Sequence, residues 1–207
     1  MRGPDAGDTL LWLIRHPEPA ASMRGICYGS LDVPLSERGV EQAQSIAMAL
    51  EREPLDAIYS SPLLRCVETA SRVASTHGLA AQTVDALREL DFGELEGCAY
   101  EEIANRYSDV YRRWMEHPTD LQFPGGESFR QMSDRVTAVT RRLLVEHRGE
   151  SLAFVTHGGV IRAILADVLG IMPENIFRIA QHYGAINRIR YMGDVPIVEL
   201  MNWTSGS

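Results

Sequence analysis

The sequence predicts an α/β protein with a largely parallel central sheet. Two short apolar runs, "TLLWLIR" (9–15) and "SLAFVTH" (151–157), are typical of strands that are buried on both faces. Segments between them have the apolar spacing of amphipathic helices. Strands that alternate with helices pack in layers, with helices against a sheet whose strands run mostly in one direction.

The elements follow from local signals. "LDAIYSS" (55–61) is a third, weaker strand, and a helix to about residue 50 is expected to begin with Ser36 as its N-cap. In "IYSSPLLRCVETA" Ser61 is a credible N-cap and Pro62 suits the first helical position. Another helix is expected from about Tyr100 to Met115.

The second half of the chain continues this pattern. A long helix should begin near Glu127 or Ser128, and an apolar stripe at helical spacing predicts which face it buries: Phe129, Met132, Val136, Val139 and Leu143. The segment "INRIRYMGDVPIVELMNW" (186–203) is typical of a β-hairpin with Gly193 and Asp194 at its turn.

Length and composition favour one domain over residues 1–207, because 45% hydrophobic residues can form a substantial core. No apolar run approaches the roughly 18 residues of a membrane span. The start "MRGPDAGD" lacks the apolar centre of a signal peptide. We therefore expect a soluble protein of the cytoplasm. Cys27, Cys66 and Cys98 are widely spaced, which argues against disulfides and thiolate metal sites.

The net charge of −8 disfavours nucleic acid or an anionic membrane as a partner, because both need a basic face. Local arginines can still bind a small anion. The oligomeric state stays open, with a homodimer among the options.

Chemically active side chains come where predicted strands end, and ligands of such sheets bind at the carboxyl ends of strands. Arg15 and His16 follow the first strand, and His157 follows another, just before Gly158 and a predicted helix whose first N–H groups can face an anion. Arg65 falls near the first turn of a third helix. Two arginines and two histidines on one rim predict a phosphate site.

A histidine in such a cluster suggests catalysis as well as binding. Nearby positive charge lowers the pKa of an imidazole, and the neutral ring is a nucleophile. Cleavage of a phosphate ester also needs a proton donor. The segment "LRELDFGELEG" (87–97) offers four candidates for that acid: Glu89, Asp91, Glu94 and Glu96.

With these motifs the sequence resembles the histidine phosphatase superfamily, whose fold is phosphoglycerate mutase-like: three layers, with helices on both faces of a largely parallel sheet. The resemblance rests on five segments in family order: "LIRHPEP", "GSLDVPLSERGVEQAQ", "SSPLLRCVETA", "LRELDFGELEG" and "VTHGGVIRA".

The resemblance implies a role for each matching residue. His16 is the nucleophile that becomes phosphorylated, and Glu89 is the general acid. Arg15, Arg65, His157 and the backbone near Gly158 bind the phosphate, so that no metal or other cofactor is required. Two positions depart from the family pattern: Pro17 replaces a glycine, and Ser22 stands where an asparagine is common. Proline has no N–H and a fixed φ, so any role that needs the flexibility of a glycine or its N–H donor is lost.

The leaving group should meet the segment from Ser22 to Leu31, in which Ser22, Tyr28 and Gly29 are the candidate substrate-binding residues, and the segment from Tyr100 to Ser128. Aromatic side chains of the second segment, Tyr111, Trp114 and Phe123, either face an aromatic base or pack in the core.

Within the superfamily, "GICYGSLDVPLS", "LRELDFGELEG" and "FPGGES" resemble α-ribazole phosphatases of cobalamin synthesis most. The resemblance therefore implies hydrolysis of a small phosphate monoester, with α-ribazole 5′-phosphate as the first candidate. The alternatives are a broad-specificity sugar-phosphate phosphatase and a phosphoglycerate mutase. A different class is a catalytically silent phosphate-binding module, against which the retention of His16 and Glu89 argues.

Overall fold

A computed structural model describes residues 7–205 of the chain. Its central sheet has six strands in the order β3-β2-β4-β1-β5-β6. Their bounds are β1 (Thr9–Arg15), β2 (Ala57–Ser60), β3 (Ala81–Thr83), β4 (Ser151–Thr156), β5 (Ile186–Met192) and β6 (Val195–Trp203). The strand β3 was not foreseen from the sequence. Most of the segment used for the signal-peptide prediction, residues 1–6, lies outside the described residues.

The sheet is largely parallel, as predicted. The strands β1, β4, β2 and β3 pair in parallel, whereas β5 pairs antiparallel with β1, and β6 with β5. The predicted C-terminal hairpin is confirmed, with Gly193 and Asp194 at its turn. Because β1, β2 and β4 run in the same direction, their carboxyl ends meet at one edge of the sheet.

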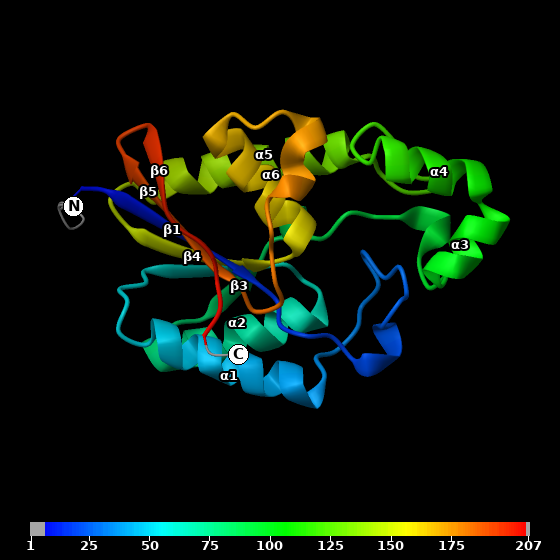
Figure 1. Cartoon of the computed structure of the whole chain (residues 1–207). Coiled ribbons are helices and arrows are strands. Elements are labelled where there is room, and N and C mark those ends of the chain that lie inside the picture. The colour runs from blue at the N-terminus through cyan, green and yellow to red at the C-terminus, as the bar shows by residue number, and fades with distance from the viewer. Residues whose placement is uncertain (1–6, 206–207) are drawn as a thin grey trace.

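Helices cover both faces of this sheet, which confirms the three-layer prediction (Figure 1). Side chains of β1 alternate between the layers: Leu11 and Leu13 pack toward α5 (Phe129–Glu146) and α6 (Gly158–Leu169). Trp12 and Ile14 pack toward α1 (Glu37–Leu50) and α2 (Leu64–His77). Burying each such side chain stabilises the fold by roughly 1.5–3 kcal/mol. Two apolar layers thus hold β1 rigidly beneath the site at its end.

Two helices begin where the local signals in the sequence predict. Ser36 caps α1, since its hydroxyl accepts a hydrogen bond from the Gly39 N–H. Ser128 caps α5 in a capping box with Gln131, and the predicted stripe of α5 is buried throughout.

The start of α2 was predicted wrongly. The helix begins at Leu64, not directly after Ser61, and its N-cap residue Leu63 makes no side-chain cap. Asp32, which is distant in the sequence, caps the helix instead: its Oδ1 accepts a hydrogen bond from the Leu64 N–H at 2.6 Å. The later start leaves the Ser61 hydroxyl available for another partner.

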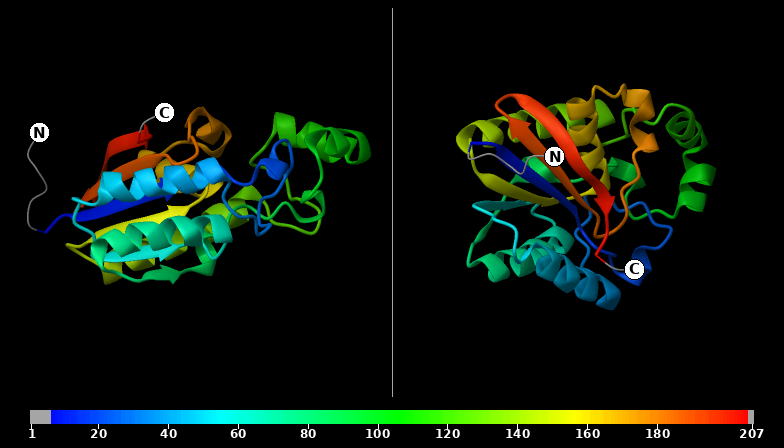
Figure 2. Two further views of the ribbon diagram at one scale, coloured as in Figure 1. Left: turned by 90° about the horizontal axis from the view of Figure 1, so that it is seen from below. Right: turned by 60° about the vertical axis from the view of Figure 1, so that its left-hand side comes forward.

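The single helix predicted from Tyr100 to Met115 is also wrong in detail. Two helices, α3 (Tyr100–Arg106) and α4 (Ser108–Glu116), meet at Tyr107, whose ψ of 43° interrupts the α conformation. Figure 2 shows this pair set apart from the two helix layers, beside the segment that follows β1.

Four short 3-10 helices complete the described part of the chain: η1 (Ala21–Met23), η2 (Asp85–Leu87), η3 (Gly93–Leu95) and η4 (Pro173–Arg178). The three cysteines are free, as predicted. Among residues 7–205 no helix is long and apolar enough to cross a membrane.

Candidate active site

The carboxyl ends of β1 and β4 bring two histidines together. His16 follows β1, and its N–H donates to the Thr156 carbonyl at the end of β4. His157 directly follows the last residue of β4, and the imidazole rings of His16 and His157 lie 5.2 Å apart. The strand-end rule therefore placed this pair correctly.

His16 is held in one tautomer. Its Nδ1 lies 2.7 Å from the Pro17 carbonyl oxygen, which can only accept a hydrogen bond, so Nδ1 carries the proton and Nε2 the lone pair. The proline that replaces the family glycine thus supplies the carbonyl that orients the ring. Burial, and then the charges of Arg65 and Arg15, hold the pKa of His16 well below its ordinary value. The ring is a neutral base with a free Nε2.

Arg65 lies in the first turn of α2 and is fully buried. Its two terminal nitrogens donate to the carbonyl oxygens of Gly29 and Leu31, each at 2.7 Å, while its Nε has no hydrogen-bond partner among the described residues. The guanidinium lies 5.2 Å from the ring centre of Tyr28. These contacts fix the plane of the cation and leave its Nε–H, together with the second N–H of each terminal nitrogen, for an anion.

Arg15 is arranged in a similar way. One terminal nitrogen donates to the Gln181 carbonyl, and its buried Nε has no partner within residues 7–205. Its guanidinium lies 4.2 Å from the ring centre of Tyr183, whose hydroxyl is 2.9 Å from that of Tyr28. Each site arginine thus stacks on one member of a hydroxyl-linked tyrosine pair.

Tyr183 is a site residue that the sequence reasoning missed. It comes after η4 and before β5, and no local motif marks it. Another is Arg162, one turn into α6 after Gly158, whose Nε donates to the Ile179 carbonyl. The pKa of Arg162 is lowered by burial and then by Arg15. In the sequence, the position of Arg162 about one turn after Gly158 and Gly159 is the signal that could have identified it as a site residue.

His157 lies behind His16 rather than on the cavity wall. It is fully buried, and its Nε2 is 2.8 Å from the Ser61 hydroxyl that the late start of α2 leaves available. Burial, followed by the charges of Arg65 and His16, lowers its pKa well below the ordinary value. His157 is therefore a neutral, oriented ring.

Only one of the four candidate acids reaches the cavity. The Glu89 carboxylate accepts from the N–H groups of Gly159 at 3.1 Å and Leu90 at 3.0 Å. Asp91 accepts from the Gly93 N–H, Glu96 accepts from Ser30 and Phe92, and Glu94 is exposed. Geometry therefore separates Glu89 from its neighbours and agrees with the choice of Glu89 that the family resemblance implied.

The cavity in front of His16 has a volume of about 340 Å³. Thirteen residues line it: Arg15, His16, Met23, Arg24, Gly25, Ile26, Tyr28, Gly29, Arg65, Glu89, Phe92, Tyr100 and Tyr183. The inner end carries Arg65, which is fully buried, and Arg15, which is partly buried. The outer end is mostly apolar and aromatic with one further cation, Arg24. Tyr28 and Gly29 thus line the cavity as predicted.

The prediction for Ser22 is wrong. Its side chain is exposed in η1 and does not line the cavity. Trp114 and Phe123 form an aromatic cluster with Phe92, with ring centres 4.8–5.2 Å apart, and neither they nor Tyr111 line the cavity. The packing interpretation of these three aromatic residues is therefore correct.

Two glycines allow neighbouring groups to pack closely around the site. A Cβ at Gly29 would lie 2.4 Å from the Leu90 carbonyl oxygen, and one at Gly158 would lie 3.3 Å from Cζ of Arg15. Among the described residues no group of three or more His, Cys, Asp or Glu side chains is arranged to hold a metal ion.

A neutral histidine beside two arginines, with a carboxylate on the same cavity wall at the edge of a parallel sheet, defines a class of enzymes that act on phosphate esters. The family pattern of the histidine phosphatase superfamily (branch 1) matches residues 11–204. The chain belongs to this superfamily and is a phosphatase.

Individual proteins to which the chain is similar also carry the names of phosphatases. The chain is 37% identical over 161 residues to phosphoserine phosphatase 1 of Hydrogenobacter thermophilus, covering 78% of this chain and 76% of that protein. It is 31% identical over 173 residues to the adenosylcobalamin/alpha-ribazole phosphatase of Escherichia coli, covering 83% and 85%. The crystal structure of the alpha-ribazole phosphatase from Shigella flexneri superposes with a TM-score of 0.85 at 28% identity, covering 94% and 96%.

Proposed function

We propose that the protein hydrolyses a small phosphate monoester through a phosphohistidine at His16. The observation that carries this proposal is the arrangement around Nε2 of His16. The ring is neutral, its other nitrogen donates to the Pro17 carbonyl, and Arg15 and Arg65 each offer a buried Nε–H that has no partner among the described residues. Such a site binds the dianion and presents a nucleophile to phosphorus.

In this proposal Arg15 and Arg65, which line the cavity, bind the non-bridging oxygens. His157 and Gly158, which the sequence also predicted as phosphate contacts, do not line it and instead pack against His16 and Arg15. The arginines balance the charge of the phosphoryl group during transfer, so the reaction proceeds without a metal ion. The ring of His157 is neutral and lies 5.2 Å from the ring of His16.

Glu89 serves both halves of the reaction. As an acid it protonates the leaving alkoxide, and as a carboxylate it then accepts a proton from the water that attacks the phosphohistidine. Its place on the cavity wall and its bond from the Gly159 N–H support this role.

The first candidate substrate is α-ribazole 5′-phosphate. The cavity wall also carries three aromatic side chains, Phe92, Tyr100 and Tyr183, which suit a flat base. The similarity to alpha-ribazole phosphatases supports the same choice. The net charge of −8 fits a small-molecule substrate rather than nucleic acid, and we expect the reaction to take place in the cytoplasm.

Phosphoserine is the second candidate. Arg24 is the one cation of the outer cavity wall and would pair with a carboxylate on the leaving group. The identity of 37% to a phosphoserine phosphatase favours the same substrate.

Phosphate release from a substrate panel tests the proposal. The panel holds α-ribazole 5′-phosphate, phosphoserine, sugar phosphates and the phosphoglycerates, with EDTA present and His16→Ala as control. A preference in kcat/KM for α-ribazole 5′-phosphate supports the first candidate, and one for phosphoserine that Arg24→Ala removes supports the second. Similar rates across the panel indicate a broad-specificity phosphatase.

Other results contradict the proposal. Exchange between 2- and 3-phosphoglycerate without phosphate release would indicate a mutase. Phosphate binding without turnover of any compound would indicate a silent binding module. Loss of activity on addition of EDTA would contradict the metal-free mechanism.

A further inference from the structure

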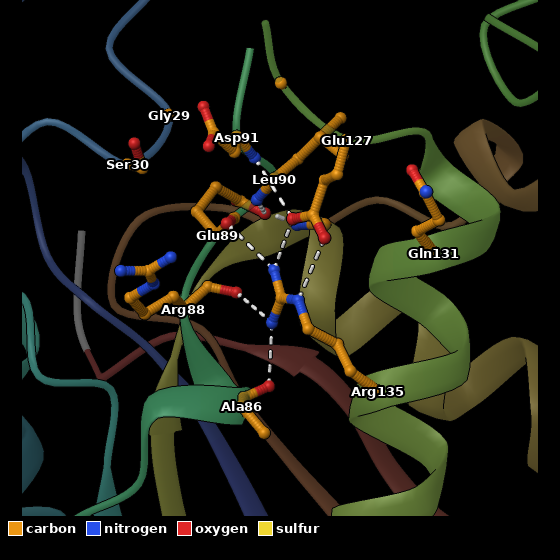
Figure 3. A network of polar contacts seen from close by, with 12 residues as sticks. Gly29, Ser30, Ala86, Arg88, Glu89, Leu90, Asp91, Glu127, Gln131 and Arg135 are labelled. Atoms are coloured by element: carbon orange, nitrogen blue, oxygen red, sulfur yellow. Dashed lines mark hydrogen bonds and ion pairs between the residues drawn. The ribbon is translucent and has the colours of Figure 1, made fainter. Parts of the chain in front are cut away.

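Arg135 of α5 uses all of its donors on Glu127 and on the segment that carries Glu89 (Figure 3). One terminal nitrogen donates to the carbonyl oxygens of Ala86 at 2.8 Å and Arg88 at 2.9 Å. The other donates to the Glu89 carbonyl at 3.1 Å and to Glu127, and Nε donates to the second carboxylate oxygen of Glu127. A guanidinium has five N–H bonds, and each of the five has an acceptor here.

Glu127 binds the backbone on the other side of Glu89, at Asp91. Its Oε1 also accepts from the Asp91 N–H at 3.2 Å, and its own N–H donates to the Asp91 carbonyl at 3.0 Å. The pair Arg135 and Glu127 therefore binds the backbone on both sides of Glu89. Both side chains are mostly buried, with exposed fractions of 26% and 19%.

Neither residue touches the Glu89 carboxylate or lines the cavity. The segment from Arg88 to Phe92 lies between η2 and η3 and has no regular hydrogen-bonded structure of its own. Its backbone position, and with it the reach of the Glu89 side chain, depends on outside partners. Arg135 and Glu127 supply four of these contacts from α5 and the turn before it.

We propose that Arg135 and Glu127 are positioning residues, which hold Glu89 where it can give its proton to the leaving group. The inference rests on the proposed role of Glu89 as the general acid. Proton transfer needs hydrogen-bond distance, and a displacement of about 1 Å in a catalytic group can cost roughly 100-fold in rate. Loosening this pair should therefore act on the proton-transfer step in particular.

Leaving-group dependence separates this role from simple structural support. An alkyl phosphate needs a proton on its departing oxygen, whereas p-nitrophenyl phosphate releases a stabilised phenolate without one. For both esters kcat/KM reports the steps up to the phosphoenzyme. Misplacement of Glu89 should thus lower kcat/KM for the alkyl ester far more than for the aryl ester.

The experiment measures kcat/KM for p-nitrophenyl phosphate and for the alkyl phosphate that the wild-type enzyme hydrolyses fastest. The variants are Arg135→Lys, which keeps the charge and loses the fork, Glu127→Gln, and Glu89→Gln as the reference for a lost acid. Arg141→Lys is the matched control, because Arg141 lies on the same helix and pairs with Asp167 at an exposed position. If Arg135→Lys does not fold, Glu127→Gln alone gives the result.

We expect Arg135→Lys and Glu127→Gln to lower kcat/KM for the alkyl ester by roughly 10- to 100-fold, and by less than about 3-fold for the aryl ester. Glu89→Gln should show the same selectivity more strongly, and Arg141→Lys should change neither value. Equal losses on both esters, or no loss, would overturn the positioning role while leaving the acid role of Glu89 intact. Absence of selectivity in Glu89→Gln would overturn both.

Discussion

The imidazole rings of His16 and His157 lie 5.2 Å apart, edge to face, and are exposed by only 2% and 0%. Burial and the two site arginines lower the pKa of both rings well below the ordinary value of 6.5. The folded protein therefore keeps two neutral histidines beside two cations, which is the charge state that a nucleophilic imidazole needs.

This arrangement predicts how stability depends on pH. Below about pH 6.5 the two histidines become protonated in the unfolded chain before they do so in the folded protein. The unfolded state then binds more protons, so the free energy of unfolding falls as the pH falls and is fully regained above about pH 6.5. Urea unfolding of the ligand-free protein at a series of pH values measures this, and His157→Gln should show a shallower decline. An equal slope in wild type and variant would contradict the prediction.

A second prediction concerns Arg65→Lys. Lysine keeps the charge but lacks the planar fork that donates to Gly29 and Leu31 and leaves Nε–H for phosphate. We expect kcat/KM to fall by about 100-fold or more, the usual cost of one transition-state donor. Steady-state kinetics with the best substrate of the panel, on protein with a wild-type circular dichroism spectrum, gives the answer. A loss below about 3-fold would show that charge alone suffices.

The Ser61→Ala variant tests the orientation of His157. It removes the hydroxyl that lies 2.8 Å from Nε2 of a fully buried ring. One hydrogen bond of this kind contributes about 1 kcal/mol, so we expect roughly a 5-fold loss in kcat/KM. Ser61→Thr keeps the hydroxyl and should retain more activity than the alanine variant. Equal activity in both variants would argue against the contact.

Gly159→Ala should separate activity from stability. A Cβ at residue 159 would lie 2.4 Å from the Glu89 carboxylate, which is the flexible end of a side chain and can move aside. Because alanine suits a helix better than glycine, the thermal midpoint should stay the same or rise. Hydrolysis of an alkyl phosphate should fall about 10-fold or more as Glu89 leaves its place. Unchanged kinetics would show that Glu89 keeps its position despite the methyl group.

The sequence was sufficient for the fold class and for the inner end of the site. Apolar strands that end in Arg15, His16 and His157 follow a rule of parallel sheets, and Arg65 follows from a helix start beside the same edge. These residues were predictable because local pattern and topology together fix where a strand ends.

Contacts between distant segments could not be read from the pattern. Asp32 caps α2 across 32 positions, and Tyr183 reaches Tyr28 across 155. Ser22 was misplaced because spacing within an irregular loop does not determine which way a side chain faces. The family resemblance pointed to Glu89 among its acidic neighbours, but the physical reason lies in the backbone path, which Arg135 holds from another helix.

Trapping the phosphoenzyme tests the central role of His16 most directly. Glu89→Gln is mixed with p-nitrophenyl phosphate, quenched rapidly without acid and analysed by peptide mass spectrometry. One phosphoryl group should be found on His16, because this ester needs no acid to form the phosphoenzyme and the variant lacks the base for its hydrolysis. The same treatment of His16→Ala should yield none. A phosphoryl group on another residue, or phosphate release by His16→Ala at the wild-type rate, would contradict the mechanism.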